Sequence, residues 1–171
     1  ITGLSAMDYR VWTDNESYIQ EFYEEVFEWP LATPVTVEAG VTAEEIDFTL
    51  DEGGSISGTV TDADENPLEG IHVEACEYDD DPQFCRGNET DENGNYLITG
   101  LLAMDYRVWA GSESYAQEFY DGVFEWNLAT PVSVVANVTT TDIDFKLAQG
   151  GSISGTVYDE LGSPLSNIAV D

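Results

Sequence analysis

The eight-residue stretch GGSISGTV occupies residues 53–60 and returns unchanged at residues 150–157, which is 97 positions later. Apolar side chains alternate in it with small polar ones, the pattern of a half-buried β-strand. A second duplicated stretch, AMDYRVW, occupies residues 6–12 and 103–109 at the same offset. At this offset 48 of the 74 overlapping positions are identical and none is inserted, so the chain is built from tandem repeats.

The glycine pairs that open both copies of the first stretch are the natural joints between repeats, because each follows a run that ends in Phe-x-Leu. We therefore predict that residues 1–52 are the C-terminal part of a preceding repeat, that residues 53–149 are one complete β-sandwich repeat, and that residues 150–171 are the N-terminal strands of a following repeat. Because the chain stops inside an alternating apolar run, we interpret it as a window of a longer tandem array.

Within one repeat the pattern predicts seven or eight short strands with frequent turns. Alternation recurs at residues 55–60, 70–75 and 143–147. The dipeptide Asn93-Gly94 predicts a hairpin whose two central residues both have positive φ. The fold class is therefore all-β, with tandem seven-to-eight-stranded, Ig-like or prealbumin-like β-sandwich repeats of 97 residues.

Residues 16–29 are ambiguous, because their apolar side chains fit one face of a helix and also alternate as in a strand. The next copy has Gly122 at the position of Glu25, and an interior glycine argues against a helix. We favour a short strand followed by an aromatic loop.

Charge limits the functions that the chain can have. The 171 residues carry 35 acidic and four basic side chains, a net charge of −31 at pH 7. This charge repels phosphate backbones and anionic lipids, so we expect no nucleic-acid partner, and no apolar run is long enough for direct membrane insertion. Bound cations, salt or solvation must offset the self-repulsion. His72 is the only histidine, so a site built on several histidines is excluded, and the carboxylates are too many to single out a catalytic pair.

Several stretches, in order, resemble the carboxypeptidase regulatory-like module. They are GSISGTVxD at residues 54–62, PLxGIxV at 67–73, TDENGNY at 90–96, GL and DYRV within 100–108, ATPV at 129–132 and IDF at 143–145. The resemblance implies a transthyretin-like, or prealbumin-like, seven-stranded sandwich, similar in architecture to the Cna B-type repeats of surface adhesins. Some Cna B-type repeats carry a Lys–Asn isopeptide bond, but here the only lysine, Lys146, is matched by Thr49, so we expect none.

Members of this family are typically non-catalytic and stacked in extracellular proteins, so the resemblance implies no enzyme activity and no required cofactor. The resemblance therefore implies a structural repeat of a secreted or cell-surface filament, fibre or stalk, whose partners are neighbouring repeats in a head-to-tail polymer. Two alternatives stay open. One is an adhesion or carbohydrate-binding module that uses surface aromatic residues, and the other is an accessory domain of a secreted hydrolase.

Cys76 and Cys85 lie nine positions apart on either side of a predicted loop, so their side chains could meet across two adjacent strands. With the extracellular resemblance, this spacing predicts a disulfide and an oxidising compartment. The alternative is two free thiols in a reducing cytosol.

Loop carboxylates offer the oxygen ligands that Ca²⁺ prefers. The candidate ligands are Asp62, Asp64, Asp79, Asp80, Asp81 and Asp91. They do not form an EF-hand, since the required twelve-residue spacing is absent, and the alternative interpretation of Asp91 is a simple hairpin turn.

Three positions match the N-glycosylation acceptor pattern, namely Asn15, Asn88 and Asn137. Composition alone predicts about one such match, so the three are hypotheses that covalent N-glycans would test.

The tryptophans Trp12, Trp29, Trp109 and Trp126 recur in both copies. They could form an outward platform that stacks on sugars, or they could cover the edge of a sandwich and contact a neighbouring repeat. Their repetition favours the second interpretation.

Residues 1–52 should present the same apolar face as residues 98–149. The matching side chains are Tyr9, Val11, Val35, Val37, Ile46, Phe48 and Leu50. The strands that cover this face come either from a preceding stretch of the same polypeptide or from a neighbouring molecule that lends its residues 150–171. We favour a continuous chain, because lending alone leaves 23 positions of a repeat unfilled.

Overall fold

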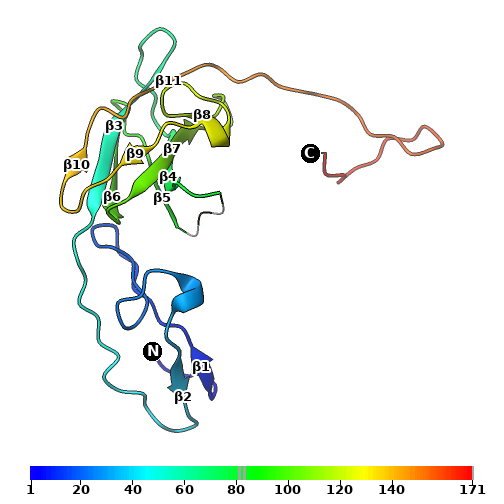
Figure 1. Ribbon diagram of the computed structural model, residues 1–171. Coiled ribbons are helices and arrows are strands. Elements are labelled where there is room, and N and C mark those ends of the chain that lie inside the picture. The colour runs from blue at the N-terminus through cyan, green and yellow to red at the C-terminus, as the bar shows by residue number, and fades with distance from the viewer. Residues whose placement is uncertain (81, 83, 171) are drawn as a thin grey trace.

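The computed structural model describes residues 1–80, 82 and 84–170, and its centre is a β-sandwich (Figure 1). The strands of the sandwich are β3 (Gly54–Asp62), β4 (His72–Glu77), β5 (Cys85–Glu89), β6 (Asn95–Leu101), β7 (Asp105–Gly111), β8 (Glu118–Phe119), β9 (Val132–Ser133), β10 (Thr139–Thr140) and β11 (Phe145–Leu147). The N-terminal segment, residues 1–52, holds β1 (Met7–Tyr9) and β2 (Val35–Val37). Two 3-10 turns, Trp29–Leu31 and Trp126–Leu128, are the only helical elements among the described residues.

The sandwich has two sheets. In the first, β3 is central: it pairs antiparallel with β6 on one side and parallel with β10 and β11 on the other. In the second, the order is β5-β4-β7-β8, and β9 also pairs with β7. The predicted all-β sandwich is confirmed. Nine strands are described in place of seven or eight, and three of them, β8, β9 and β10, have only two residues each.

The core lies between the sheets and contains the apolar residues that alternate in the sequence. Its largest fully buried side chains are Tyr106, Ile56, Ile98, Leu101, Leu147, Val60, Val73 and Val108. One buried polar contact joins β6 to the residues just before β11, since the Tyr96 hydroxyl donates to the Ile143 carbonyl at 2.6 Å. Burial raises the pKa of Tyr96, so this hydroxyl stays protonated and able to donate.

The hairpin at Asn93-Gly94 forms, but the predicted turn chemistry is wrong. Only Gly94 has a positive φ, of 75°. The reason is Asp91, whose carboxylate accepts the backbone N–H groups of Asn93 and Asn95 at 2.9 and 2.8 Å. This side chain closes the turn and lets Asn93 keep an ordinary backbone conformation.

Residues 16–29 form no α-helix, as predicted. Phe22 and Val26 exchange two backbone hydrogen bonds around a tight turn, and Glu24 and Glu25 both have positive φ. In the sandwich, Phe119 and Val123 make the same pair of bonds. The aromatic loop is therefore a small hairpin followed by a 3-10 turn.

The N-terminal segment repeats the pairing of the sandwich. Tyr9 pairs with Val35 as Tyr106 pairs with Val132. The backbone N–H of Tyr23 donates to the Val11 carbonyl at 2.9 Å, and the bond 97 positions later has the same length. The duplicated sequence thus gives duplicated local structure.

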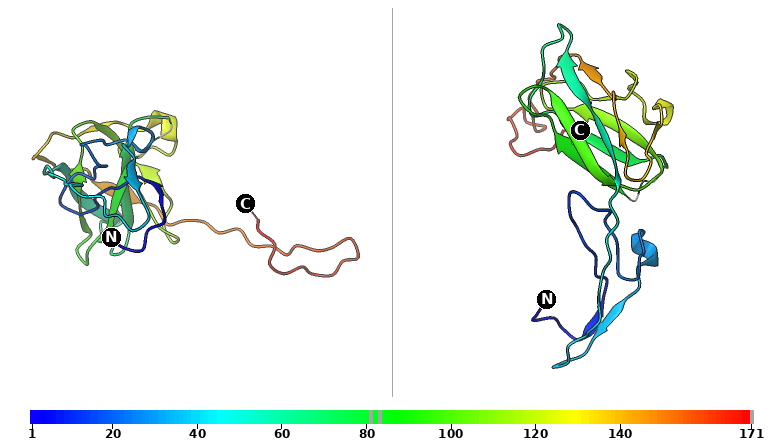
Figure 2. Two further views of the ribbon diagram at one scale, coloured as in Figure 1. Left: turned by 90° about the horizontal axis from the view of Figure 1, so that it is seen from below. Right: turned by 90° about the vertical axis from the view of Figure 1, so that its left-hand side faces the viewer.

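The two terminal segments leave the sandwich from opposite ends (Figures 1 and 2). The N-terminal segment lies where β3 begins, and the C-terminal segment, residues 150–170, leaves beyond β11. Among the described residues, no helix is long and apolar enough to cross a membrane.

Candidate interaction site

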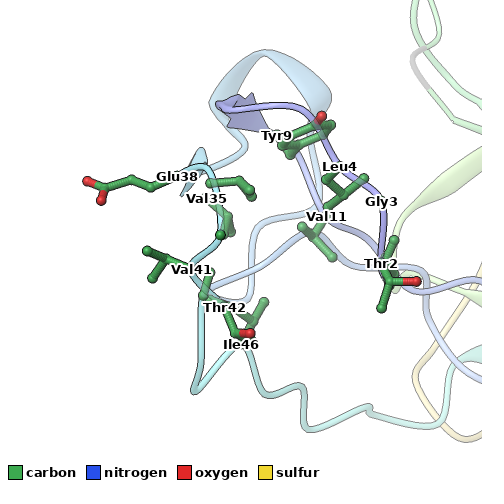
Figure 3. Close-up of a pocket in the computed structure, with 14 residues that line it drawn as sticks. Thr2, Gly3, Leu4, Tyr9, Val11, Val35, Glu38, Val41, Thr42 and Ile46 are labelled. Carbon is green, nitrogen blue, oxygen red and sulfur yellow. The ribbon is translucent and has the colours of Figure 1, made fainter.

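An open apolar groove runs along the N-terminal segment (Figure 3). Its volume is about 490 Å³. The residues that line it are Ile1, Thr2, Gly3, Leu4, Tyr9, Val11, Val35, Val37, Glu38, Gly40, Val41, Thr42, Ala43 and Ile46. We call this feature the groove.

The groove is open because the segment has no strand equivalent to β3. In the sandwich, Tyr106 and Val108 are fully buried. Their counterparts Tyr9 and Val11 are half-buried, although their backbones pair in the same way. The sequence-based expectation of an uncovered face in residues 1–52 thus matches the burial of these side chains.

The C-terminal segment lacks a partner sheet, because its residues 151–157 repeat the sequence of β3 but pair with no described strand. Ile153 is fully exposed at 104%, whereas its counterpart Ile56 is at 0%. Val157 is 37% exposed and its counterpart Val60 is at 0%. Unlike ends of one chain therefore present an open apolar face and an unpaired apolar strand.

Arg86 of β5 joins the sandwich to the N-terminal segment. Its guanidinium donates to the Asn15 carbonyl at 2.8 Å and lies 3.5 Å from the Asp14 carboxylate. The hydroxyl of Thr99 on β6 donates to the Glu16 carbonyl beside it. We call this contact, between residues 14–18 and Arg86 with Thr99, the junction. Arg86 is one of four basic residues among 35 acidic ones, and this rarity is the signal by which the sequence could have identified it.

Two buried carboxylates lie at equivalent places in the N-terminal segment and the sandwich. Glu21 is 4% exposed and Glu118 is 8% exposed. Burial raises the pKa of both, and the nearby charges of Glu25 and Asp51 raise that of Glu21 further. The negative charge is therefore carried at a cost inside each copy. The identity of Glu21 and Glu118 in the repeat was visible in the sequence, but their burial was not.

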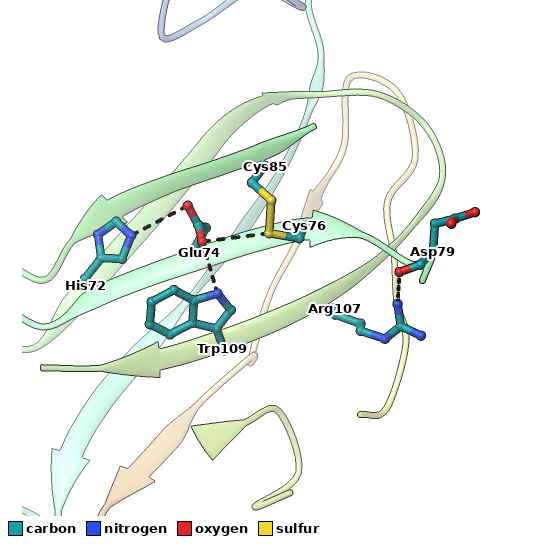
Figure 4. Close-up of a disulfide and its surroundings, with 7 residues drawn as sticks. All are labelled: His72, Glu74, Cys76, Asp79, Cys85, Arg107 and Trp109. Carbon is teal, nitrogen blue, oxygen red and sulfur yellow. Dashed lines mark hydrogen bonds and ion pairs between the residues drawn. A yellow bond between two sulfur atoms is a disulfide. The ribbon is translucent and has the colours of Figure 1, made fainter. Parts of the chain in front are cut away.

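The predicted disulfide is confirmed, since Cys76 and Cys85 are bonded across the paired strands β4 and β5 (Figure 4). The Glu74 carboxylate lies 3.8 Å from the sulfur of Cys76 and accepts the indole N–H of Trp109 at 3.1 Å. Among the described residues, Glu74 and the two cysteines are the one group close enough to hold a metal ion. Their oxidation to a disulfide removes the thiolates that such a site would need.

The predicted calcium ligands lie at two ends of the sandwich. The turns that hold Asp62 and Asp91 are adjacent, because the backbone N–H of Val60 donates to the Gly94 carbonyl at 2.8 Å. Asp79 and Asp80 follow the far end of β4 and contact Arg107: its guanidinium donates to the Asp79 carbonyl and lies 3.8 Å from the Asp80 carboxylate.

Asp62 and Asp91 act as turn caps. Asp62 accepts the backbone N–H groups of Asp64 and Asn66, and both of its oxygens contact the Asn66 side-chain amide. Hydrogen bonds from Asn66 lower the pKa of Asp62, as those from Asn95 lower that of Asp91. Asp81 lies outside the described residues, and a calcium site stays a prediction.

The three glycosylation acceptors are exposed but differ in their contacts. Asn15 is part of the junction, and its side-chain oxygen accepts the Ser17 N–H at 2.8 Å. The side-chain amide of Asn88 donates to the Leu97 carbonyl at 3.0 Å. Asn137 has a φ of 59° in an exposed turn. Their modification stays a prediction.

Each tryptophan contacts residues of its own segment, either the N-terminal segment or the sandwich. Trp12 and Trp29 lie 6.1 Å apart and are each 50% exposed. In the sandwich, Trp109 instead packs on His72 at 5.4 Å, while the guanidinium of Arg107 lies 4.6 Å from the ring centre of Trp126. Trp12 is more exposed because its segment has no counterpart of β4. Contact with sugars or with a neighbouring repeat stays a prediction for all four.

The family model of the carboxypeptidase regulatory-like domain matches residues 55–148. A comparison with curated proteins finds no match.

Several solved structures are similar to the chain. A streptococcal ancillary pilin is 16% identical over 85% of this chain and 45% of its own, with a TM-score of 0.39. BcpA, the major pilin subunit of Bacillus cereus, is 15% identical over 70% of this chain and 33% of its own, with a TM-score of 0.39. A 3-chlorocatechol 1,2-dioxygenase from Rhodococcus opacus is 14% identical over 58% of this chain and 62% of its own, with a TM-score of 0.39. The chain spans less than two thirds of the length of each.

Proposed function

Because the chain belongs to the carboxypeptidase regulatory-like domain family, we propose that it is a non-catalytic structural repeat of a secreted filament or cell-surface stalk. Its units are joined head to tail, and its partners are further units of the same protein. Length is then set by the number of units, and each unit contacts only its neighbours.

The observation that carries the proposal is the junction. The sandwich holds residues 14–18 of the N-terminal segment through Arg86 and Thr99. The sandwich also has its own copy of residues 14–18, namely residues 111–115. This loop lies where the C-terminal segment leaves the sandwich, since the backbone N–H of Gly150 donates to the Ser114 carbonyl. Each unit therefore has a surface that receives this loop and a loop of its own to offer. Such unlike surfaces build an open linear polymer and need not close.

The disulfide and the charge support the extracellular part of the proposal. A bond between Cys76 and Cys85 persists in an oxidising compartment. A net charge of −31 keeps a long polymer soluble and separates neighbouring polymers by repulsion.

Electron microscopy of native extracellular material, labelled with antibodies raised against the chain, tests the proposal. We expect unbranched threads about one sandwich wide, labelled along their length. Antibody absorbed beforehand with the purified chain is the control and should leave the threads unlabelled. Label on isolated particles, or only inside cells, would contradict the proposal.

A further inference from the structure

We propose that the groove binds residues 151–159 of a second copy of the chain as an added strand, in the register that β3 has in the sandwich. The inference rests on the proposed function, because it names the contact by which one molecule would continue the polymer of the next. It follows from a comparison of the chain with itself.

The groove is a copy of the surface on which β3 lies. Of its 14 lining residues, 11 are identical to the residues 97 positions later. The proposed occupant is a copy of β3, since residues 150–157 are identical to residues 53–60. The packing of β3 against residues 98–149 in the sandwich is therefore a structural template for the proposed contact between two molecules.

The register follows from the sandwich. There Ser55 pairs with Thr139 and Val60 with Phe145, both in parallel register. The hydroxyls of Ser55 and Thr139 lie 2.7 Å apart, and the Ser55 N–H donates to the Val138 carbonyl at 3.0 Å.

Moved by 97 positions, these pairs become contacts between two molecules. Ser152 of the second copy lies opposite Thr42, and its Val157 lies opposite Phe48. Asp47 adds a polar contact to Thr156, because its counterpart Asp144 accepts both the N–H and the hydroxyl of the equivalent threonine at 2.7 and 2.9 Å.

Both partners gain apolar burial from this contact. Ile153 would pass from full exposure to the environment of Ile56, which is completely buried. Half-buried Tyr9 and Val11 would be covered as their counterparts are. Removal of apolar surface from water is the main driving force for such association.

The donor strand has part of its final structure before it binds. The Asp159 N–H donates to the Ser163 carbonyl at 2.9 Å, and the Leu165 N–H to the Val157 carbonyl at 2.8 Å. The turn that follows β3 has the same two bonds. A preformed turn lowers the conformational entropy lost on binding.

A second copy is the occupant because the segments that carry the groove and the donor strand of one chain leave its sandwich from opposite ends (Figure 1). The 23 positions that lending leaves unfilled correspond to residues 75–97, which form half of β4, all of β5 and the first three residues of β6. The added strand would therefore pair with residues 42–50 on one side and with residues 1–4 on the other, whereas the other sheet would stay open.

A glycine makes the contact sterically specific. A Cβ on Gly58 would lie 2.0 Å from the Ile143 carbonyl oxygen, which is far below any contact distance. A Cβ on the counterpart Gly155 meets no described atom within 4 Å. Gly155→Ala should thus leave the single molecule intact and block its docking against Ile46 of the next.

Cysteine cross-linking tests the register in the full chain. In the double variant Thr42→Cys/Ser152→Cys, the two Cα atoms lie about 5 Å apart when the strand is bound, which a disulfide can bridge. Mild oxidation should give a ladder of multiples of 18.8 kDa on a non-reducing gel. The matched control, Thr42→Cys/Ser154→Cys, places the Cα atoms about 8 Å apart, beyond disulfide range, and should stay monomeric. No ladder, equal ladders, or a cross-link within one molecule would overturn the proposal.

Sedimentation of single variants tests the affinity. Gly155→Ala should weaken association at least about tenfold while the melting temperature of the sandwich stays unchanged. Ser154→Ala is the control and should associate as the wild type does, because the counterpart Ser57 keeps a half-exposed side chain. Association of Gly155→Ala at wild-type strength would overturn the proposal.

These tests separate the inference from the proposed function. Native threads without the cross-linked ladder would refute strand exchange and leave the filament in place. A ladder without native threads would refute the filament and leave strand exchange in place.

Discussion

The Thr90 hydroxyl, which follows β5, bonds the backbone just before β4, and its loss should lower the free energy of unfolding. The side chain is 5% exposed. Its hydroxyl donates to the Leu68 carbonyl at 2.6 Å and accepts the Ile71 N–H at 2.9 Å. Valine has the same shape but replaces this hydroxyl with a methyl group, so Thr90→Val leaves both backbone groups buried without these bonds.

The expected loss follows from those two groups. Each buried backbone group left without its hydrogen bond costs about 1–3 kcal/mol, so the loss of both should lower the free energy of unfolding of Thr90→Val by about 2–6 kcal/mol. With a urea m-value of about 2 kcal/mol/M, the midpoint should fall by about 1–3 M. Thr90→Ser keeps the hydroxyl and loses one buried methyl group, which costs about 0.8 kcal/mol.

Urea unfolding of unglycosylated protein with the disulfide intact measures both variants, followed by the circular dichroism of the sheets. Unglycosylated protein is needed because Thr90 also completes the acceptor pattern of Asn88. The m-value should not change. If Thr90→Val were no less stable than Thr90→Ser, the reasoning from buried backbone groups would be refuted.

Three further predictions concern the junction, the disulfide and a buried carboxylate. Arg86→Ala should speed hydrogen exchange of the amides in residues 14–18 by about tenfold, because charge-assisted hydrogen bonds are lost. Arg86→Lys should rescue little, because lysine lacks the guanidinium fork. Unchanged exchange would show that other contacts hold the junction. The double variant Cys76→Ala/Cys85→Ala should lower the free energy of unfolding in urea by about 2.5 kcal/mol, because the unfolded chain gains loop entropy. Reduction of the wild-type disulfide should give the same loss. A loss below about 0.5 kcal/mol would contradict this. Because burial raises the pKa of Glu118 above 4.5, its charge lowers stability above the raised pKa, and this cost disappears as the pH falls toward 4.5. Glu118→Gln should therefore raise the urea midpoint at pH 7 and raise it less near pH 4, and a gain that grows toward acid would show that the sign is wrong.

Local pattern was sufficient for most of the fold. Alternation predicted that Ile56 and Val60 face a core, and the structure buries both completely. Strand alternation is a local property, because successive side chains point to opposite faces whatever the strand pairs with. The repeat added long-range information, since identical residues 97 positions apart adopt equivalent pairings such as Tyr9 with Val35 and Tyr106 with Val132.

The sequence also predicted the disulfide, because two cysteines on adjacent strands of a hairpin are brought together by that hairpin alone. It predicted the wrong backbone conformation for Asn93, because the dipeptide rule leaves out the Asp91 side chain that closes the turn. The error is physical: a carboxylate can supply the hydrogen bonds that would otherwise require a second residue with positive φ.

What the sequence determined by itself was therefore the all-β class, the 97-residue period, the inward faces and the cysteine pair. Only the tertiary structure decided that Arg86 reaches residues 14–18, that Asp62 caps its own turn, and that Gly155 has open space where Gly58 has a carbonyl. The physical reason is distance along the chain. Alternation and hairpins act over a few residues, whereas these contacts depend on where the packed sheets carry side chains that are far apart in the sequence.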